Sequence, residues 1–159
     1  MGFVGGALSA LLSAGVFFAD QELKQASEEE RLPRQGEKTN ARLSFSNHHN
    51  YGAALNFLEK RPLIVRSLAL SMTVFCTVLF LFTFGKKGAG FLKAALAFLL
   101  GGAYSNLYDR LKQEYVIDYI ALRLPGEGIN LAGRGNIKEL IFNIADLGVA
   151  IGAMLLAFT

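Results

Sequence analysis

Long apolar stretches alternate with charged segments along this chain. Four of the apolar stretches are each close to the ~20 residues that a helix needs to cross ~30 Å of hydrocarbon. They cover residues 3–19, 62–84, 89–108 and 139–158. Such alternation is typical of a protein that crosses a bilayer several times. The pattern therefore predicts an all-α membrane protein with four transmembrane helices.

Two long polar segments, residues 20–61 and 109–138, join the first span to the second and the third to the fourth. Within them, ARLSFSNHHNYGAALNF and YVIDYIAL have the patterns of β-strands, and LPGEGINLAGRGN is typical of turns. SEEER at residues 27–31 has the capping-box spacing that predicts a short surface helix. We therefore expect a small β-sheet, built from the two long loops, beside the helices.

The composition agrees with a membrane protein and argues against several other classes. The 159 residues are enough for a single domain, residues 1–159, and 52% of them are hydrophobic, which is high for a soluble protein of this size. The net charge of +3 comes without an interleaved aromatic and basic stripe, so we expect no nucleic-acid partner. Cys76 is the only cysteine in the sequence, which excludes an internal disulfide.

Four consecutive spans alternate in direction, which brings selected span ends to one membrane face. The ends of the first and third spans and the starts of the second and fourth share this face with both long loops. The unusual polar residues all converge there: Asp20, Lys24, Asn50, Asn106, Asp109, Arg110, Asp118, Asn143 and Asp146. Counts and local density of Lys and Arg favour opposite orientations in the membrane, so these residues leave the orientation open.

Asp146 is the most unusual of these residues because it lies within an apolar stretch. In a helix that begins at residue 139 it would lie ~10 Å along the axis, with Asn143 on the same helical face. A lone ionised carboxylate there costs at least ~2.5 kcal/mol, so it needs a polar cavity or a partner. Two interpretations remain: a functional acid, or a structural carboxylate paired with Lys24 or Arg110.

Other residues have a structural interpretation. Asp20 and Lys24 are spaced as an i,i+4 ion pair, and so are Arg110 and Glu114. The basic residues within the spans are expected to extend their side chains to the headgroups; they are Arg66 and Lys93. Small residues spaced four apart are expected to pack the third span on the fourth; they are Gly101, Ser105, Gly148 and Gly152.

Catalysis by a metal or by a cysteine has little support in the sequence. His48 and His49 are adjacent on a predicted strand and would point to opposite faces, so we expect no metal site. Cys76 lies in the middle of a span without a histidine to activate it, and we expect it to be a small core residue. No nucleophile-elbow or phosphate-loop motif is present in the sequence. The carboxylates remain as candidates.

Five sequence blocks, taken together and in order, resemble the bacterial lipoprotein signal peptidase family, also called signal peptidase II. They are DQELK at 20–24, NYGAALNF at 50–57, GGAYSNLYDR at 101–110, VIDYI at 116–120 and FNIAD at 142–146. The chain differs from the family pattern at Leu55, where an aromatic residue is usual, at Ser105, where a glycine is common, and at residues 121–138, which have no counterpart.

The resemblance implies an aspartyl endopeptidase whose catalytic pair is Asp118 and Asp146. It implies that the site is completed by Asn50, Gly52, Asn106, Arg110 and Asn143. Asp20 and Lys24 are expected to be structural or accessory. No cofactor is expected, and the two carboxyl groups would share one proton to activate water.

The resemblance also implies a place in the cell and a substrate. The enzyme would lie in the bacterial inner membrane as a monomer among membrane lipids, with both termini in the cytoplasm and the active site near the outer face. It would remove the signal peptide from diacylglyceryl-modified prolipoproteins, cutting before the lipidated cysteine. The alternatives are a small transporter or proton-relay subunit, in which Asp118 is dispensable, and an inactive scaffold.

Overall fold

The structure is a computed structural model that describes residues 2–33, 42–53, 57–126, 128–131 and 135–159. The chain is mostly helical and carries a small antiparallel sheet. In order, the elements are α1 (Gly2–Glu28), β1 (Leu43–Asn50), α2 (Pro62–Thr83), α3 (Gly90–Lys112), β2 (Val116–Arg123), β3 (Ile129–Leu131), β4 (Gly135–Ile137), β5 (Glu139–Phe142) and α4 (Ile144–Leu156).

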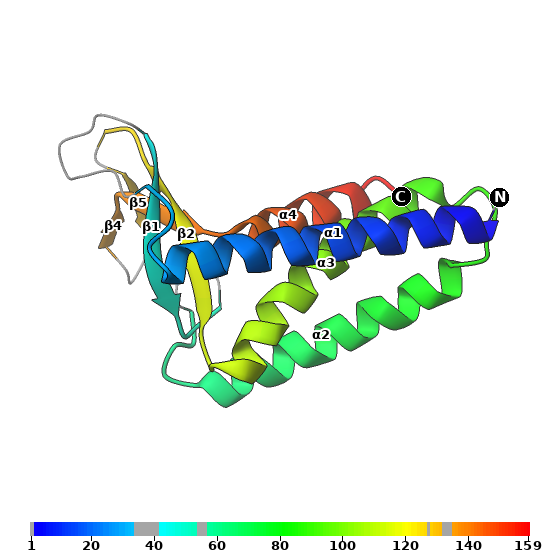
Figure 1. The fold of residues 1–159 in the computed structure, drawn as a ribbon, viewed down its shortest axis with the longest axis horizontal. Helices are drawn as coiled ribbons and strands as arrows, with labels where there is room; N and C mark the ends of the chain where they lie inside the picture. The colour runs from blue at the N-terminus through cyan, green and yellow to red at the C-terminus, as the bar shows by residue number, and fades with distance from the viewer. Residues whose placement is uncertain (1, 34–41, 54–56, 127, 132–134) are drawn as a thin grey trace.

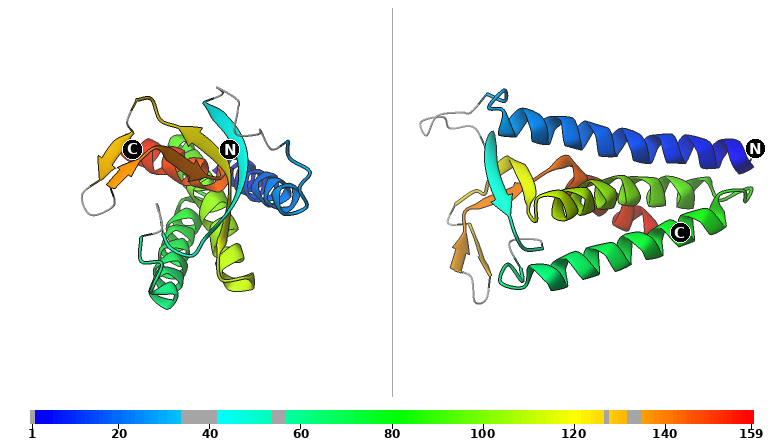
Figure 2. Two further views of the ribbon diagram at one scale, coloured as in Figure 1. Left: turned by 90° about the vertical axis from the view of Figure 1, so that its left-hand side faces the viewer. Right: turned by 60° about the horizontal axis from the view of Figure 1, so that its bottom comes forward.

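The helices lie side by side, and the strands gather at one end of them (Figure 1). The sheet lies at the end where α1 and α3 finish and where α2 and α4 begin, whereas both chain termini lie at the opposite end (Figures 1 and 2). This arrangement brings the polar ends of the apolar stretches and the loop strands to one place. The predicted convergence of the polar residues follows from it.

β2 is the central strand of the three-stranded sheet and pairs antiparallel with β1 on one side and β5 on the other. The strands predicted within 41–57 and 115–122 are therefore confirmed. The register between β1 and β2 shifts between Phe45 and His48, and beyond this irregularity His48 lies opposite Asp118. Residues 121–138, for which no counterpart was found, include the end of β2 and a separate hairpin of β3 and β4.

Close packing of α3 on α4 depends on glycines, as the sequence predicts for Gly148 and Gly152. A Cβ atom at Gly152 would lie 2.5 Å from the backbone nitrogen of Leu99, and one at Gly102 would meet the carbonyl oxygen of Ala145. The expectation for Gly101 was wrong, because this residue packs on α1: its Cβ would lie 2.6 Å from the carbonyl oxygen of Ser13. The close approach of α3 to α4 fixes the start of α4.

Two predicted boundaries were wrong. The helix predicted at SEEER does not form separately, since α1 continues to Glu28 and Ser27 donates a side-chain hydrogen bond to the carbonyl oxygen of Ser46 on β1. The fourth apolar stretch does not start as a helix, because residues 139–142 pair with β2 as strand β5. Helix α4 begins only after this strand and has 13 residues.

Two helices, α1 and α2, are long and apolar enough to cross a membrane among the described residues. The basic residues of the spans differ from each other. Arg66 is partly exposed and forms an ion pair of 2.9 Å with Glu114, whereas Lys93 is buried and donates to the carbonyl oxygens of Gly2 and Lys86. Lys93 therefore does not extend outward as expected, but ties the start of α1 to the turn before α3.

Candidate active site

Strand β2 carries Asp118 into the junction between the sheet and the helices. Its side chain is buried, with 2% of the residue exposed. One carboxylate oxygen accepts a hydrogen bond of 3.0 Å from the Asn50 side-chain amide on β1, and the other accepts one of 2.8 Å from the Asn143 amide. The two strands and the start of α4 thus hold this carboxylate from three directions.

Asp146 is held by the N-terminal cap of α4. Asn143 is the N-cap residue, and its side-chain oxygen accepts a hydrogen bond of 2.8 Å from the backbone N–H of Asp146. In return, the Asn143 backbone N–H donates to the Asp146 carboxylate over 3.2 Å. Such a capping box satisfies two free backbone donors. The expected depth of ~10 Å along the helix was therefore wrong, since Asp146 lies in the first turn.

Asn106 on α3 connects the two carboxylate groups through its amide. Its Nδ2 donates a hydrogen bond of 2.8 Å to Asp146, and its Oδ1 accepts one of 3.2 Å from the amide of Asn143. The same Asn143 amide donates to Asp118. Two asparagine side chains therefore join Asp118 and Asp146 in a continuous hydrogen-bond network.

The two carboxylates form no ion pair with any residue that the structure describes. The alternative in which Lys24 or Arg110 neutralises Asp146 is therefore not observed. Arg110 instead donates to the backbone oxygens of Asn106, at 3.2 Å, and Gly52, at 2.9 Å. Its expected partner Glu114 pairs with Arg66.

The carboxylates line a cavity of about 380 Å³ between the sheet and α4. One part of its wall is polar and includes Asn50, Arg110, Asp118 and Asp146. The rest of the wall is mainly apolar and comes from residues of β5 and α4, including Phe142, Val149 and Ala153. The cavity therefore offers a polar end for a peptide bond next to an apolar surface.

Burial changes the acidity of Asp118. Loss of solvent, followed by the nearby negative charge of Asp146, raises its pKa to about 7, although the amides of Asn50 and Asn143 act in the opposite direction. A carboxyl group with this pKa can hold a proton near neutral pH. In the protonated form it can donate this proton to a developing oxyanion. In the ionised form it can take a proton from water.

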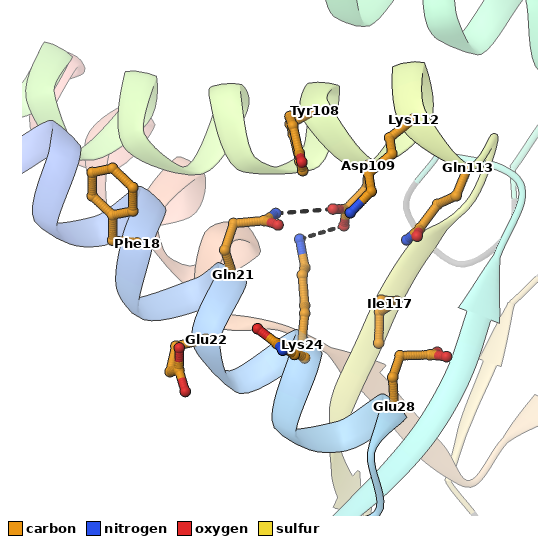
Figure 3. A pocket seen from close by; sticks show the side chains of 11 residues that line it. Phe18, Gln21, Glu22, Lys24, Glu28, Tyr108, Asp109, Lys112, Gln113 and Ile117 are labelled. Atoms are coloured by element: carbon orange, nitrogen blue, oxygen red, sulfur yellow. Dashed lines mark hydrogen bonds and ion pairs between the residues drawn. The ribbon is translucent and has the colours of Figure 1, made fainter.

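A second charged cluster lies beside the first, on α1 and α3. The expected ion pair between Asp20 and Lys24 is present at 2.6 Å, and Lys24 also contacts Asp109 at 2.7 Å (Figure 3). Asp20 further accepts hydrogen bonds from Tyr119, at 2.9 Å, and Ser105, at 2.6 Å. The sequence pattern does not predict that Tyr119 joins this cluster, because its partner lies 99 positions away.

The pair of Lys24 and Asp109 forms part of the wall of another cavity, of about 510 Å³, between α1 and α3 (Figure 3). Gln21 points into the same region and donates to Asp109 over 2.9 Å (Figure 3). Among the described residues, no group of three or more His, Cys, Asp and Glu side chains could hold a metal ion.

The structure brings together all seven residues for which the sequence predicts a place in the site. Asn50, Asn106, Asn143, Asp118 and Asp146 form one hydrogen-bond network. The other two are connected to it: the backbone N–H of Gly52 donates to the Asn50 side chain over 3.0 Å, and the Gly52 carbonyl accepts from Arg110. Leu55, where the chain differs from the family pattern, lies outside the described residues.

Comparison with known proteins finds one family throughout. The family model described as signal peptidase (SPase) II matches residues 12–159. The lipoprotein signal peptidase of Alteromonas mediterranea is 36% identical over 115 residues, which cover 71% of this chain and 58% of that protein. The enzyme of the same name from Teredinibacter turnerae is 30% identical over 145 residues, covering 90% of this chain and 80% of that protein.

The matched stretch spans less than two thirds of several relatives, as in the Acinetobacter baylyi lipoprotein signal peptidase, where it covers 56% of the protein at 36% identity. The fold is also similar to two solved structures described as bacterial membrane enzymes. Their TM-scores are 0.73 and 0.68, at 24% and 25% identity, and each alignment covers 96% of this chain and 86% or 91% of the other. On the match of the family model to residues 12–159, this chain belongs to the signal peptidase II family.

Proposed function

We propose that this protein is an intramembrane aspartyl endopeptidase that removes the signal peptide from diacylglyceryl-modified prolipoproteins, cutting before the lipidated cysteine. One observation carries the proposal. Asp118 and Asp146 are joined through asparagine amides, have no cation as a direct partner among the described residues, and open onto a cavity with an apolar wall. Membership of the signal peptidase II family supports the same reaction and substrate.

The two carboxyl groups divide the work of amide hydrolysis. Two neighbouring acids do not both ionise easily, so the pair holds one proton near neutral pH. The raised pKa of Asp118 supports this state. The ionised member takes a proton from water as the water oxygen attacks the scissile carbonyl carbon. The protonated member donates to the carbonyl oxygen, which gives a tetrahedral diol without a covalent enzyme intermediate.

The remaining site residues hold the acids and the substrate. Asn106 and Asn143 fix the two carboxylates through their amide groups, since each of these side chains contacts an acid directly. Arg110 and Asn50 line the polar end of the cavity and are both hydrogen-bonded to Gly52. A guanidinium at this place can hold a peptide oxygen or a lipid headgroup oxygen. The apolar wall would receive the acyl chains.

The protein would form a single membrane domain, residues 1–159, with four spanning helices. Helix α4 is the shortest, and its 13 residues extend only ~20 Å. A short span that begins at the cap holding Asp146 would place the two acids at the boundary of the hydrocarbon layer. The sheet would lie on the outer side of the bacterial inner membrane, and both termini would be cytoplasmic. We propose a monomer surrounded by membrane lipids.

Cleavage of a lipidated precursor peptide in detergent or lipid tests the proposal. Asp118→Asn and Asp146→Asn should each lower turnover at least ~100-fold, because each removes a group that transfers a proton. Glu114→Gln is a matched control, since this exposed carboxylate is paired with Arg66 and lies outside the network of Asp118 and Asp146. Near-normal turnover by either aspartate variant would exclude Asp118 and Asp146 as a catalytic dyad. A dispensable Asp118 would favour a transporter or proton relay instead.

A further inference from the structure

The orientation of the Asn106 amide decides what Asp146 meets. An asparagine side chain has a hydrogen-bond donor on one side and an acceptor on the other, and the two ends are nearly identical in shape. In the structure the NH2 group faces Asp146 at 2.8 Å. If the amide turned over, its oxygen would face a carboxylate oxygen and the hydrogen bond would be lost.

Lys24 contacts the opposite end of the same amide. Its ammonium nitrogen donates to Asn106 Oδ1 over 3.0 Å, from a side chain that is almost fully buried, with 1% of the residue exposed. The ammonium group has three donors and no acceptor. Of the two ends of the Asn106 amide, the ammonium can therefore bind only the oxygen, and a turned amide would place two sets of donors against each other.

The ammonium is itself fixed in place by two carboxylates from different helices. Asp20 holds it from one turn earlier on α1, at 2.6 Å, and Asp109 holds it from α3, at 2.7 Å (Figure 3). Ser105 lies 3.3 Å from the same nitrogen. These contacts leave Lys24 little freedom to move away from Asn106.

The second asparagine of the network is fixed without Lys24. Its oxygen accepts from the backbone N–H of Asp146, which is also a donor only, so the Asn143 amide must face Asp118 with its NH2 group. Local helix capping therefore orients Asn143. The Asn106 amide is oriented by contacts from other elements: its oxygen accepts from Lys24 on α1 over 3.0 Å and from Asn143 at the start of α4 over 3.2 Å.

We propose that Lys24 is a positioning residue for the hydrolytic reaction: through Asn106 it directs a hydrogen-bond donor at Asp146. This inference rests on the proposed peptidase function. Loss of Lys24 would remove the shorter and charged of the two hydrogen bonds that hold the Asn106 oxygen, which makes it easier for the amide to turn away. The ionised form of the aspartate pair would then lose a donor that stabilises it. Other charged groups around Asp146 are Asp118 on β2, Arg110 on α3 and Asp20 on α1.

The test measures kcat/KM against pH for the lipidated peptide with Lys24→Met and Asp109→Asn. Lys24→Met should lower kcat at least ~10-fold and move the acidic limb of the profile to higher pH, because a carboxylate that loses a donor is harder to ionise. KM should change little. Asp109→Asn removes one of the two carboxylates that hold Lys24 but keeps Asp20 and the contact between Lys24 and Asn106, so its acidic limb should shift much less than that of Lys24→Met.

A double-mutant cycle separates positioning from general damage. In an Asn106→Ala background, Lys24→Met should reduce kcat by less than ~3-fold further, because the group through which it acts is absent. Equal effects of Lys24→Met in both backgrounds would overturn the proposal, and so would a wild-type profile for Lys24→Met alone.

Folding of each variant can be followed through Cys76, the only thiol in the sequence and a buried one, with a dye that reacts when unfolding exposes it. If Lys24→Met does not fold, the double variant Lys24→Met/Asp109→Asn removes the cation together with one of its carboxylates. Compared with Asp109→Asn alone, the double variant must show an acidic limb of kcat/KM that is shifted to higher pH. An unshifted acidic limb would refute the role of Lys24. Failure of the wild type to cleave the peptide, in contrast, would refute the proposed function itself.

Discussion

Two pairs of aspartates lie at the same end of the helices, three of them buried and Asp146 partly buried, and the pairs differ in what compensates their charge. Asp20 and Asp109 both contact the ammonium group of Lys24. Asp118 and Asp146 accept hydrogen bonds from asparagine amides and a backbone N–H instead. A carboxylate beside a cation favours the ionised form, whereas one that has only neutral donors in a buried place remains easier to protonate.

The two clusters are built from neighbouring positions on the same elements. On β2, Asp118 enters the site while Tyr119, on the opposite face of the strand, contacts Asp20. On α3, Asn106 contacts Asp146 while the preceding Ser105 contacts Asp20. One strand and one helix therefore contribute side chains to both clusters. The difference between the clusters lies in single side chains and not in the backbone.

Substitution of Asp20 should give the largest loss of stability. Asp20→Ala leaves the Lys24 ammonium with one carboxylate fewer and leaves the Tyr119 hydroxyl and the Ala145 backbone N–H without their acceptor. We expect the free energy of unfolding to fall by about 3 to 5 kcal/mol, as when one member of a buried ion pair is removed. Thermal unfolding reported by Cys76 measures it. A loss below about 1 kcal/mol would show that this cluster is not a structural support.

The pH dependence of stability should distinguish the proposed catalytic pair from the ion-paired aspartates. The pKa of Asp118 rises from its ordinary 3.8 to about 7 on folding, so the folded state binds the proton more tightly between these values. Stability from this group is therefore present at low pH and is lost as pH rises from about 4 towards about 7. Asp118→Asn lacks this loss, so the unfolding temperature of the variant relative to the wild type should increase over that range. A constant difference would contradict the assignment.

An exposed ion pair provides the smallest expected effect. Arg66 and Glu114 lie 2.9 Å apart, but the Glu114 side chain is 73% exposed. Pairs of this kind contribute about 0.2 to 1 kcal/mol. Glu114→Ala should therefore change the unfolding temperature by only a few degrees and leave peptide cleavage unchanged. A loss of stability as large as that of Asp20→Ala would mean that the exposure of an ion pair does not predict its contribution to stability in this protein.

Much of the fold was predictable because the pattern of the sequence is strong. Apolar stretches fixed the number and order of the helices, and strand-like patterns located β1 and β2. The start of α4 was missed, because ELIF is apolar enough to continue either a helix or a strand and only its pairing with β2 decides between them. For the same reason Asp146 was placed too far along its helix.

The site residues were predictable as a group, but their contacts were not. The direction of the helices brings Asn106, Asp118 and Asp146 to one end, and this follows from the order of the spans. The contact of Tyr119 with Asp20, and the contact of Lys24 with Asn106, depend on which face each element turns to its neighbour. The hydropathy pattern does not show how each helix or strand is rotated about its axis at these polar positions, so it does not predict which polar side chains meet.

The central claim is that Asp118 and Asp146 share one proton while they activate water, and the pH dependence of kcat/KM on a lipidated precursor peptide tests it most directly. We predict a bell-shaped dependence of kcat/KM on pH, because activity needs one acid ionised and the other protonated. Activity that remains level far into alkaline pH would contradict it, since the proton that the pair must donate would then be absent.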